Sequence, residues 1–187
     1  KIEHPYYERL KNALALYRGL RAGGGWPRIP EGPTLERGAT GERVVTLRQR
    51  LKASGDLAGA DTSSPRFDEE LEQAVMRFQL RHVLNPDGAV GPATLKAMNV
   101  LLEDRIDQIR VNLERARWVL SNLGDRYVLV DIAGYRVFYL DAEAGAWSTR
   151  AQVGKPYRDT PVLRSRIESI EINPTWTVPP TILNNDV

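Results

Sequence analysis

The chain has 187 residues, which is enough for one large or two small domains with buried cores. Its 26 Lys and Arg residues nearly balance its 24 Asp and Glu residues, and no basic block interleaved with aromatic residues occurs, which argues against nucleic acid as a partner. The absence of cysteine excludes disulfides, thiolate metal sites and cysteine nucleophiles within these residues, and no apolar run is long enough to span a membrane.

The first predicted element is an amphipathic helix within residues 3–20, where Tyr6, Leu10, Leu14 and Tyr17 recur at helical spacing. Three consecutive glycines at residues 23–25 and three prolines at residues 27, 30 and 33 end this pattern. We therefore predict an N-terminal helix and linker over residues 1–33.

Residues 34–100 carry the pattern of a compact unit of three short helices. The first is expected to end near Ser54–Gly55, the second at the turn signal of residues 85–88, and the third begins at Gly91–Pro92, because proline favours the first helical position. The apolar faces of the first two helices are formed by Val44, Leu47 and Leu51, and by Leu71, Ala74, Val75 and Phe78.

A longer amphipathic helix is predicted within residues 101–124, where apolar residues alternate at spacings of four and three. Coiled-coil pairing is one interpretation of this repeat. The other is a connecting helix that lies across a neighbouring domain, which the shortness of the repeat favours.

The pattern becomes that of β-strands from residue 125 onward. Residues 127–132 and 135–140 are rich in β-branched and aromatic residues, and the Ala133–Gly134 pair between them predicts a hairpin with a two-residue turn. Further strands are predicted over residues 146–153 and 166–172. Helices followed by strands indicate an α+β fold class.

The helical unit of residues 34–100 resembles the small three-helix peptidoglycan-binding domain. The most specific part is the D-G-x-x-G-x-x-T run of residues 87–94. The resemblance implies that motif residues contact peptidoglycan, and the candidates are Gln79, Asp87, Gly88, Gly91 and Thr94. The alternative, which we favour for most of them, is that they satisfy the turn and the helix start: a glycine with positive φ, and polar side chains that pair with loop backbone.

The region over residues 125–187 resembles the beginning of the L,D-transpeptidase catalytic domain of large periplasmic enzymes that also carry a peptidoglycan-binding domain. The resemblance rests on the R-A-R-W run of residues 115–118, V-G-K of residues 153–155, and I-N-P-T-W-T-V-P-P-T-I of residues 172–182. It implies Trp176 as a candidate for the substrate cleft. It also implies a periplasmic location, with any signal or anchor removed from this segment.

Enzymes of this family use a cysteine in a late S-x-G-C-type segment, which forms a thioester with a donor stem peptide before a neighbouring amine resolves it. This chain contains neither that segment nor a cysteine, so we assign no catalytic residue and expect a truncated, inactive piece. His4 and His82 lie far apart in the sequence, so we expect no metal site and no cofactor. His82 lies near the end of the second helix, where a cation favours the helix dipole.

Three functional hypotheses follow. In the first, the chain supplies wall targeting and part of the catalytic fold of a peptidoglycan L,D-transpeptidase, with stem peptides and glycan as partners. In the second, it is a non-catalytic module that anchors to peptidoglycan through residues 34–100. In the third, the exposed edge of an incomplete sheet exchanges strands between copies.

Overall fold

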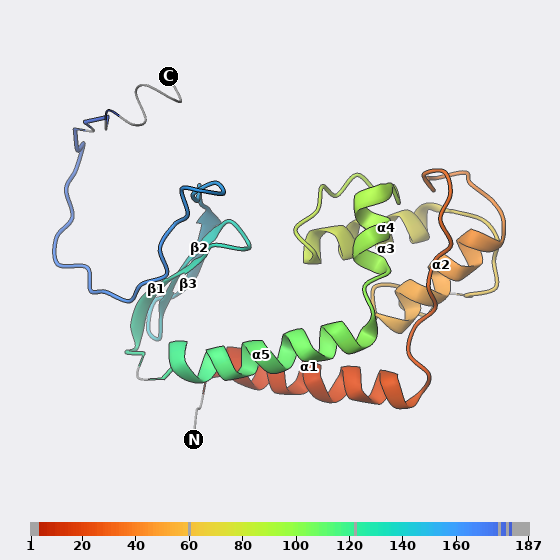
Figure 1. Ribbon diagram of the computed structural model, residues 1–187, viewed down its shortest axis with the longest axis horizontal. Helices are drawn as coiled ribbons and strands as arrows, with labels where there is room; N and C mark the ends of the chain where they lie inside the picture. The colour runs from red at the N-terminus through yellow and green to blue at the C-terminus, as the bar shows by residue number, and fades with distance from the viewer. Residues whose placement is uncertain (1–3, 60, 122, 176, 179, 181–187) are drawn as a thin grey trace. The chain divides into compact units, whose positions relative to one another are not determined.

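The computed structural model describes residues 4–59, 61–121, 123–175, 177, 178 and 180. These residues form five helices followed by a three-stranded antiparallel sheet, which confirms the predicted α+β class (Figure 1). By its internal contacts the chain divides into one unit of residues 1–128 with 139–147, and another of residues 129–138 with 148–187.

The three predicted short helices are α2 (Glu42–Ala53), α3 (Glu69–Arg81) and α4 (Pro92–Met98). Asp68 caps α3, since its carboxylate accepts a hydrogen bond from the Leu71 backbone N–H at 3.0 Å. The apolar faces predicted for α2 and α3 are fully buried, and each large side chain among them contributes about 1.5–3 kcal/mol by burial. The fully buried side chains include Val44, Leu47, Leu51, Phe67, Leu71, Val75, Phe78 and Met98.

The proline-rich segment before α2 packs against this bundle. Ile29 is fully buried in the core, and its backbone N–H and C=O pair with the Oδ1 and Nδ2 atoms of Asn99, both at 2.9 Å. Leu35 forms an antiparallel bridge with Val90. Ile29 therefore belongs to the bundle core, although its extended backbone leaves no periodic signal in the sequence.

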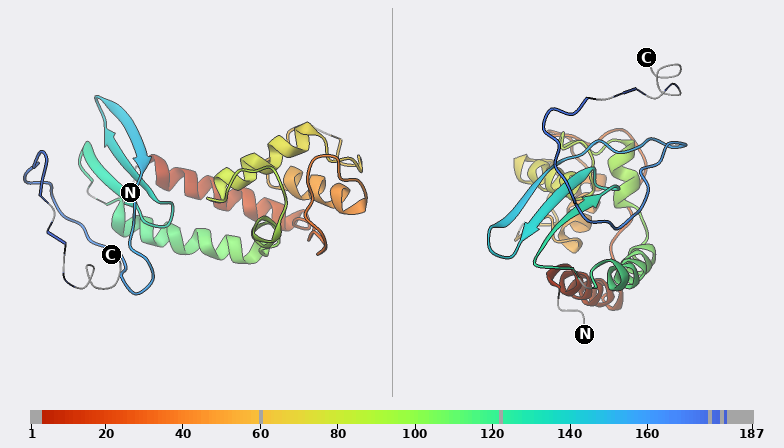
Figure 2. Two further views of the ribbon diagram at one scale, coloured as in Figure 1. Left: turned by 90° about the horizontal axis from the view of Figure 1, so that it is seen from above. Right: turned by 90° about the vertical axis from the view of Figure 1, so that its left-hand side faces the viewer.

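The N-terminal helix α1 (Pro5–Ala22) and the long helix α5 (Leu102–Val119) lie side by side and run antiparallel (Figures 1 and 2). At one end of the pair, Arg117 Nε donates to the Tyr7 hydroxyl at 3.1 Å. At the other end, Leu102 lies against the backbone of Gly25. The long helix therefore packs along a helix of its own chain, as the helix-pairing interpretation of its repeat predicts, and its role as a connecting helix stays a prediction.

The sheet contains β1 (Arg126–Asp131), β2 (Arg136–Asp141) and β3 (Gly145–Arg150), in the order β1-β2-β3. The predicted hairpin is confirmed, but its turn spans residues 132–135 rather than two residues. The Asp131 carboxylate explains the longer turn, because it accepts a hydrogen bond from the Gly134 N–H at 3.0 Å.

The strand predicted over residues 166–172 is wrong, because these residues carry no regular secondary structure. Their apolar side chains are exposed, with Ile167 at 72%, Ile170 at 85% and Ile172 at 84%. A β-branched run predicts a strand only where a neighbouring strand pairs with it, and no described strand does so here.

Candidate functional site

The side-chain amide of Gln79 lies at the centre of the motif. It is 1% exposed, and its Nε2 atom lies 2.8 Å from Asp87 Oδ1, 2.9 Å from the Ala89 carbonyl oxygen and 3.1 Å from Thr94 Oγ1. Its Oε1 atom accepts a hydrogen bond from the Gly88 N–H at 2.9 Å. Both ends of the amide are therefore used to hold the turn between α3 and α4.

The turn itself needs its aspartate and glycine. The Asp87 carboxylate accepts from the Ala89 N–H at 3.0 Å, and this bond together with the one from Gln79 lowers the pKa of Asp87. Gly88 has a φ of +76°, and a Cβ atom there would lie 2.8 Å from Glu72 Cγ.

The structure thus joins four of the five predicted motif residues, Gln79, Asp87, Gly88 and Thr94, in one network, and of these only Asp87 is exposed. Their contact with peptidoglycan stays a prediction, and the geometry gives them a structural role. The fifth, Gly91, faces a cleft. Trp176 lies outside the described residues.

That cleft has a volume of about 610 Å³ and is lined by residues from three segments, 28–34, 90–96 and 99–104. Val90, Leu95 and Val100 supply apolar surface. Four charged residues also line it: Arg28, Glu31, Lys96 and Asp104. We call this site the charged cleft.

Internal hydrogen bonds hold the walls of the charged cleft in place. Arg43 donates from Nε to the Pro30 carbonyl at 3.0 Å and from Nη1 to the Pro33 carbonyl at 2.8 Å, which braces residues 30–33. On the other side, the Trp26 indole N–H donates to the Val100 carbonyl at 3.3 Å. Asn99, which lines the cleft, is fixed by its two bonds to Ile29. A site built this way loses little entropy when it binds a ligand.

Buried Arg50 supports the same region from behind. Its guanidinium lies 3.9 Å from the Trp26 ring centroid, and its Nε donates to the Met98 carbonyl at 2.8 Å. Burial lowers the pKa of Arg50 to about 10, so it stays cationic at neutral pH. This cation–π contact fixes Trp26 against the bundle.

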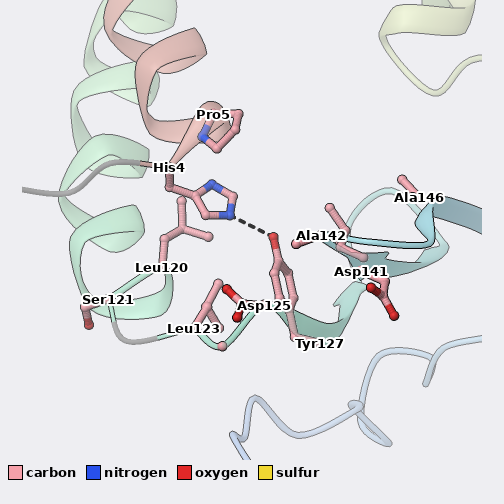
Figure 3. A pocket seen from close by; sticks show the side chains of 13 residues that line it. His4, Pro5, Leu120, Ser121, Leu123, Asp125, Tyr127, Asp141, Ala142 and Ala146 are labelled. Atoms are coloured by element: carbon pink, nitrogen blue, oxygen red, sulfur yellow. Dashed lines mark hydrogen bonds between the residues drawn. The ribbon is translucent and has the colours of Figure 1, made fainter.

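A second cavity, of about 860 Å³, lies where the N-terminus of α1 meets the start of β1 (Figure 3). His4 Nδ1 accepts from the Tyr6 backbone N–H at 3.2 Å, so the imidazole proton resides on Nε2, which donates to the Tyr127 hydroxyl at 2.7 Å. Burial lowers the pKa of His4 and raises the pKa of Tyr127. Both side chains are therefore neutral, and their hydrogen bond joins the N-cap of α1 to strand β1.

The Asp141 carboxylate, which also lines that cavity, already accepts four hydrogen bonds within the protein. It accepts from the backbone N–H groups of Ala144 at 3.1 Å and Glu143 at 2.9 Å, from the Tyr139 hydroxyl at 2.9 Å and from Arg126 Nε at 2.7 Å. These bonds hold the pKa of Asp141 well below its usual range. Asp141 thus shapes the turn between β2 and β3.

The prediction of a cationic His82 is wrong at neutral pH. Its ring stacks on Phe78 with 3.9 Å between centroids, and its Nδ1 donates to the Phe78 carbonyl at 2.8 Å. Burial lowers the pKa of His82 to about 4, so the ring is neutral. Over the described residues, no three His, Asp or Glu side chains converge in a way that could hold a metal ion.

Comparison with known proteins gives three similarities. Residues 40–98, which span α2, α3 and α4, match the peptidoglycan binding domain family, and residues 125–187 match the L,D-transpeptidase catalytic domain family. The chain is also 40% identical over 70 residues to the N-acetylmuramoyl-L-alanine amidase CwlL of Bacillus licheniformis. That similarity covers 36% of this chain but only 19% of the amidase.

None of the described helices is both long enough and apolar enough to cross a membrane. The two family matches follow each other in the predicted order, the first on a helical bundle and the second on a region that begins with a β-sheet. The chain therefore carries a peptidoglycan-binding domain followed by a region of the L,D-transpeptidase catalytic domain family, the arrangement of a large L,D-transpeptidase-type protein.

Proposed function

We propose that this chain binds peptidoglycan through residues 34–100 and contributes residues 125–187 to the catalytic domain of an enzyme that crosslinks stem peptides. The observation that carries the proposal is the pair of family matches in sequence on one chain. We further propose that residues 1–33 form an N-terminal helix and linker, and that residues 101–124, which hold α5, connect the two regions.

The proposed reaction is acyl transfer through a thioester. A cysteine thiolate attacks a carbonyl of the donor stem peptide, the C–N bond to the terminal residue breaks, and the amine of a neighbouring stem peptide then displaces the thiolate. The 187 residues contain no cysteine, so they do not supply this nucleophile. Their proposed share of the activity is to bind the wall and to form strands of the catalytic fold.

The proposed location is the periplasm. Both matched families act on the cell wall, which indicates an extracytoplasmic protein. The amidase relative is named for N-acetylmuramoyl-L-alanine, the junction of glycan and stem peptide, which supports the wall as the shared target.

Co-sedimentation with purified sacculi tests the binding part of the proposal. The 187-residue chain should pellet with sacculi at low salt in a saturable manner, and soluble muropeptides should release it. Heat-unfolded chain is the control for trapping. Equal recovery of the folded chain in the supernatant with and without sacculi would overturn the proposal.

The second candidate function is a non-catalytic anchoring module, and the lack of cysteine favours it. Reading the encoding gene past Val187 separates the two: an S-x-G-C-type segment supports the transpeptidase, and its absence supports the anchor. Strand exchange between copies stays a prediction, which light scattering that shows only monomer would remove.

A further inference from the structure

We propose that the charged cleft binds the stem peptide of peptidoglycan rather than its glycan, with Arg28 and Lys96 facing peptide carboxylates and Glu31 and Asp104 facing its free amine. This inference rests on the proposed function. It assigns the binding to a surface that lies mostly outside the matched residues 40–98, since Lys96 is the only one of the four charges within them.

The motif network of Gln79, Asp87, Gly88 and Thr94 has few polar groups left to bind a ligand. The Gln79 amide is used at both ends inside the protein, and Thr94 is 5% exposed. The same turn carries Val90 and Gly91, which face the charged cleft. The motif network therefore positions one wall of the charged cleft, and the cleft, not the network, is the surface that we assign to the ligand.

The charged side chains of the cleft have no partners within the described part of the protein. The side chains of Arg28, Glu31, Lys96 and Asp104 form no ion pair or hydrogen bond with any other described residue. Elsewhere on the same unit some exposed charges are paired, for example Arg37 with Glu69 at 3.0 Å. Two free cations and two free anions around apolar surface suit a ligand that carries both signs of charge.

The charges of the cleft and the residue types that line it favour a stem peptide over the glycan as the ligand. A stem peptide carries carboxylates and, where it contains a diamino acid, a free ammonium group, whereas the glycan backbone is uncharged where its lactyl groups are amide-linked. Sugar rings are typically bound by stacking on aromatic side chains, and no aromatic residue is among the described residues that line the cleft. The cleft volume of about 610 Å³ lies within the roughly 300–1,000 Å³ typical of small-ligand sites.

The experiment is calorimetric titration of the full 187-residue chain with two soluble probes. One is the tetrapeptide L-Ala–γ-D-Glu–diaminopimelate–D-Ala acetylated at its alanine amine, so that the diaminopimelate side-chain amine is its only free amine. The other is the disaccharide of N-acetylglucosamine and N-acetylmuramic acid with its lactyl carboxyl group amidated, so that it carries no charge. We expect the tetrapeptide to bind and the disaccharide to bind at least tenfold more weakly. Tighter binding of the disaccharide would overturn the preference for peptide.

Charge reversal then locates the site. The double variant Arg28→Glu/Lys96→Glu should weaken tetrapeptide binding at least tenfold, whereas Lys52→Glu, on an exposed α2 position outside the cleft, should leave it unchanged. All four charges are exposed or lie at the surface, so circular dichroism should show an intact fold. Unchanged tetrapeptide binding by the folded double variant would overturn the cleft.

The acidic pair has its own test. The variant Glu31→Gln/Asp104→Asn should weaken binding of the tetrapeptide, but it should bind a tetrapeptide whose diaminopimelate amine is also acetylated as the unmodified chain does. Equal weakening for both peptides would overturn the assigned role of the acidic pair. If the chain binds sacculi while the cleft variants bind like wild type, the cleft assignment fails and the proposed function stands; if it binds no sacculi at all, the proposed function itself fails.

Discussion

Replacing Gln79 with leucine tests whether its amide holds the turn between α3 and α4. The Gly88 N–H, which is buried, and the half-buried Ala89 carbonyl would both lose their side-chain partner. A buried backbone group left unpaired costs about 1–3 kcal/mol, and a half-buried one costs less, so Gln79→Leu should lower the free energy of unfolding by about 2–4 kcal/mol.

Urea denaturation followed by far-UV circular dichroism measures this change. The matched control is Gln73→Leu, an exposed position on the same helix, which should stay within about 0.5 kcal/mol of wild type. Because the turn also forms one wall of the charged cleft, Gln79→Leu should weaken binding to sacculi as well. A loss of less than about 0.5 kcal/mol for Gln79→Leu would refute the structural role of the amide.

Three further changes test other contacts. Arg50→Met removes the donor to the Met98 carbonyl and the cation over Trp26, so urea denaturation should show a loss of about 1–3 kcal/mol; unchanged stability would contradict this role. Folded His82 has a pKa of about 4 against an ordinary 6.5, so its contribution to stability is present above pH 6.5 and is lost as the pH falls toward 4. After discounting for solvent screening, the free energy of unfolding should fall by roughly 1–2 kcal/mol over this pH range, as measured by urea denaturation at several pH values. The variant His82→Gln should lack this pH dependence. Asp141→Ala should speed amide hydrogen exchange at Glu143 and Ala144, and protection that persists in this variant would contradict the assigned turn. In the unmodified chain this protection should survive acidification through the ordinary aspartate pKa, because these bonds hold the pKa of Asp141 well below that range; loss of protection there would contradict the assignment.

The helical bundle could be predicted because apolar residues at helical spacing mark the buried face of each helix. Val44, Leu47 and Leu51 recur at three and four residues, and the structure buries each of them. Ile29 belongs to no such periodic pattern, because it reaches the core from an extended backbone segment between prolines. The repeat in α5 likewise indicated an apolar face, but a repeat does not identify which helix covers that face.

The candidate site was predictable only in part. The D-G-x-x-G-x-x-T run pointed to the turn and to Gln79, and turn chemistry explained why those residue types occur there. The charged cleft could not be predicted, because Arg28 and Asp104 come from segments far apart in the sequence and neither belongs to a motif. His82 was misjudged for a related reason: its distance from the helix end was visible in the sequence, whereas its burial on Phe78 was not.

Chemical-shift mapping of the backbone amides during titration with the soluble tetrapeptide tests the central claim most directly, because it reports binding and its place together. The account predicts saturable shifts at Gly91, Lys96 and Asn99, which line the charged cleft, with little change at the exposed face of α2 around Lys52. Saturable shifts confined to residues away from the cleft, or none at any ligand concentration, would contradict it.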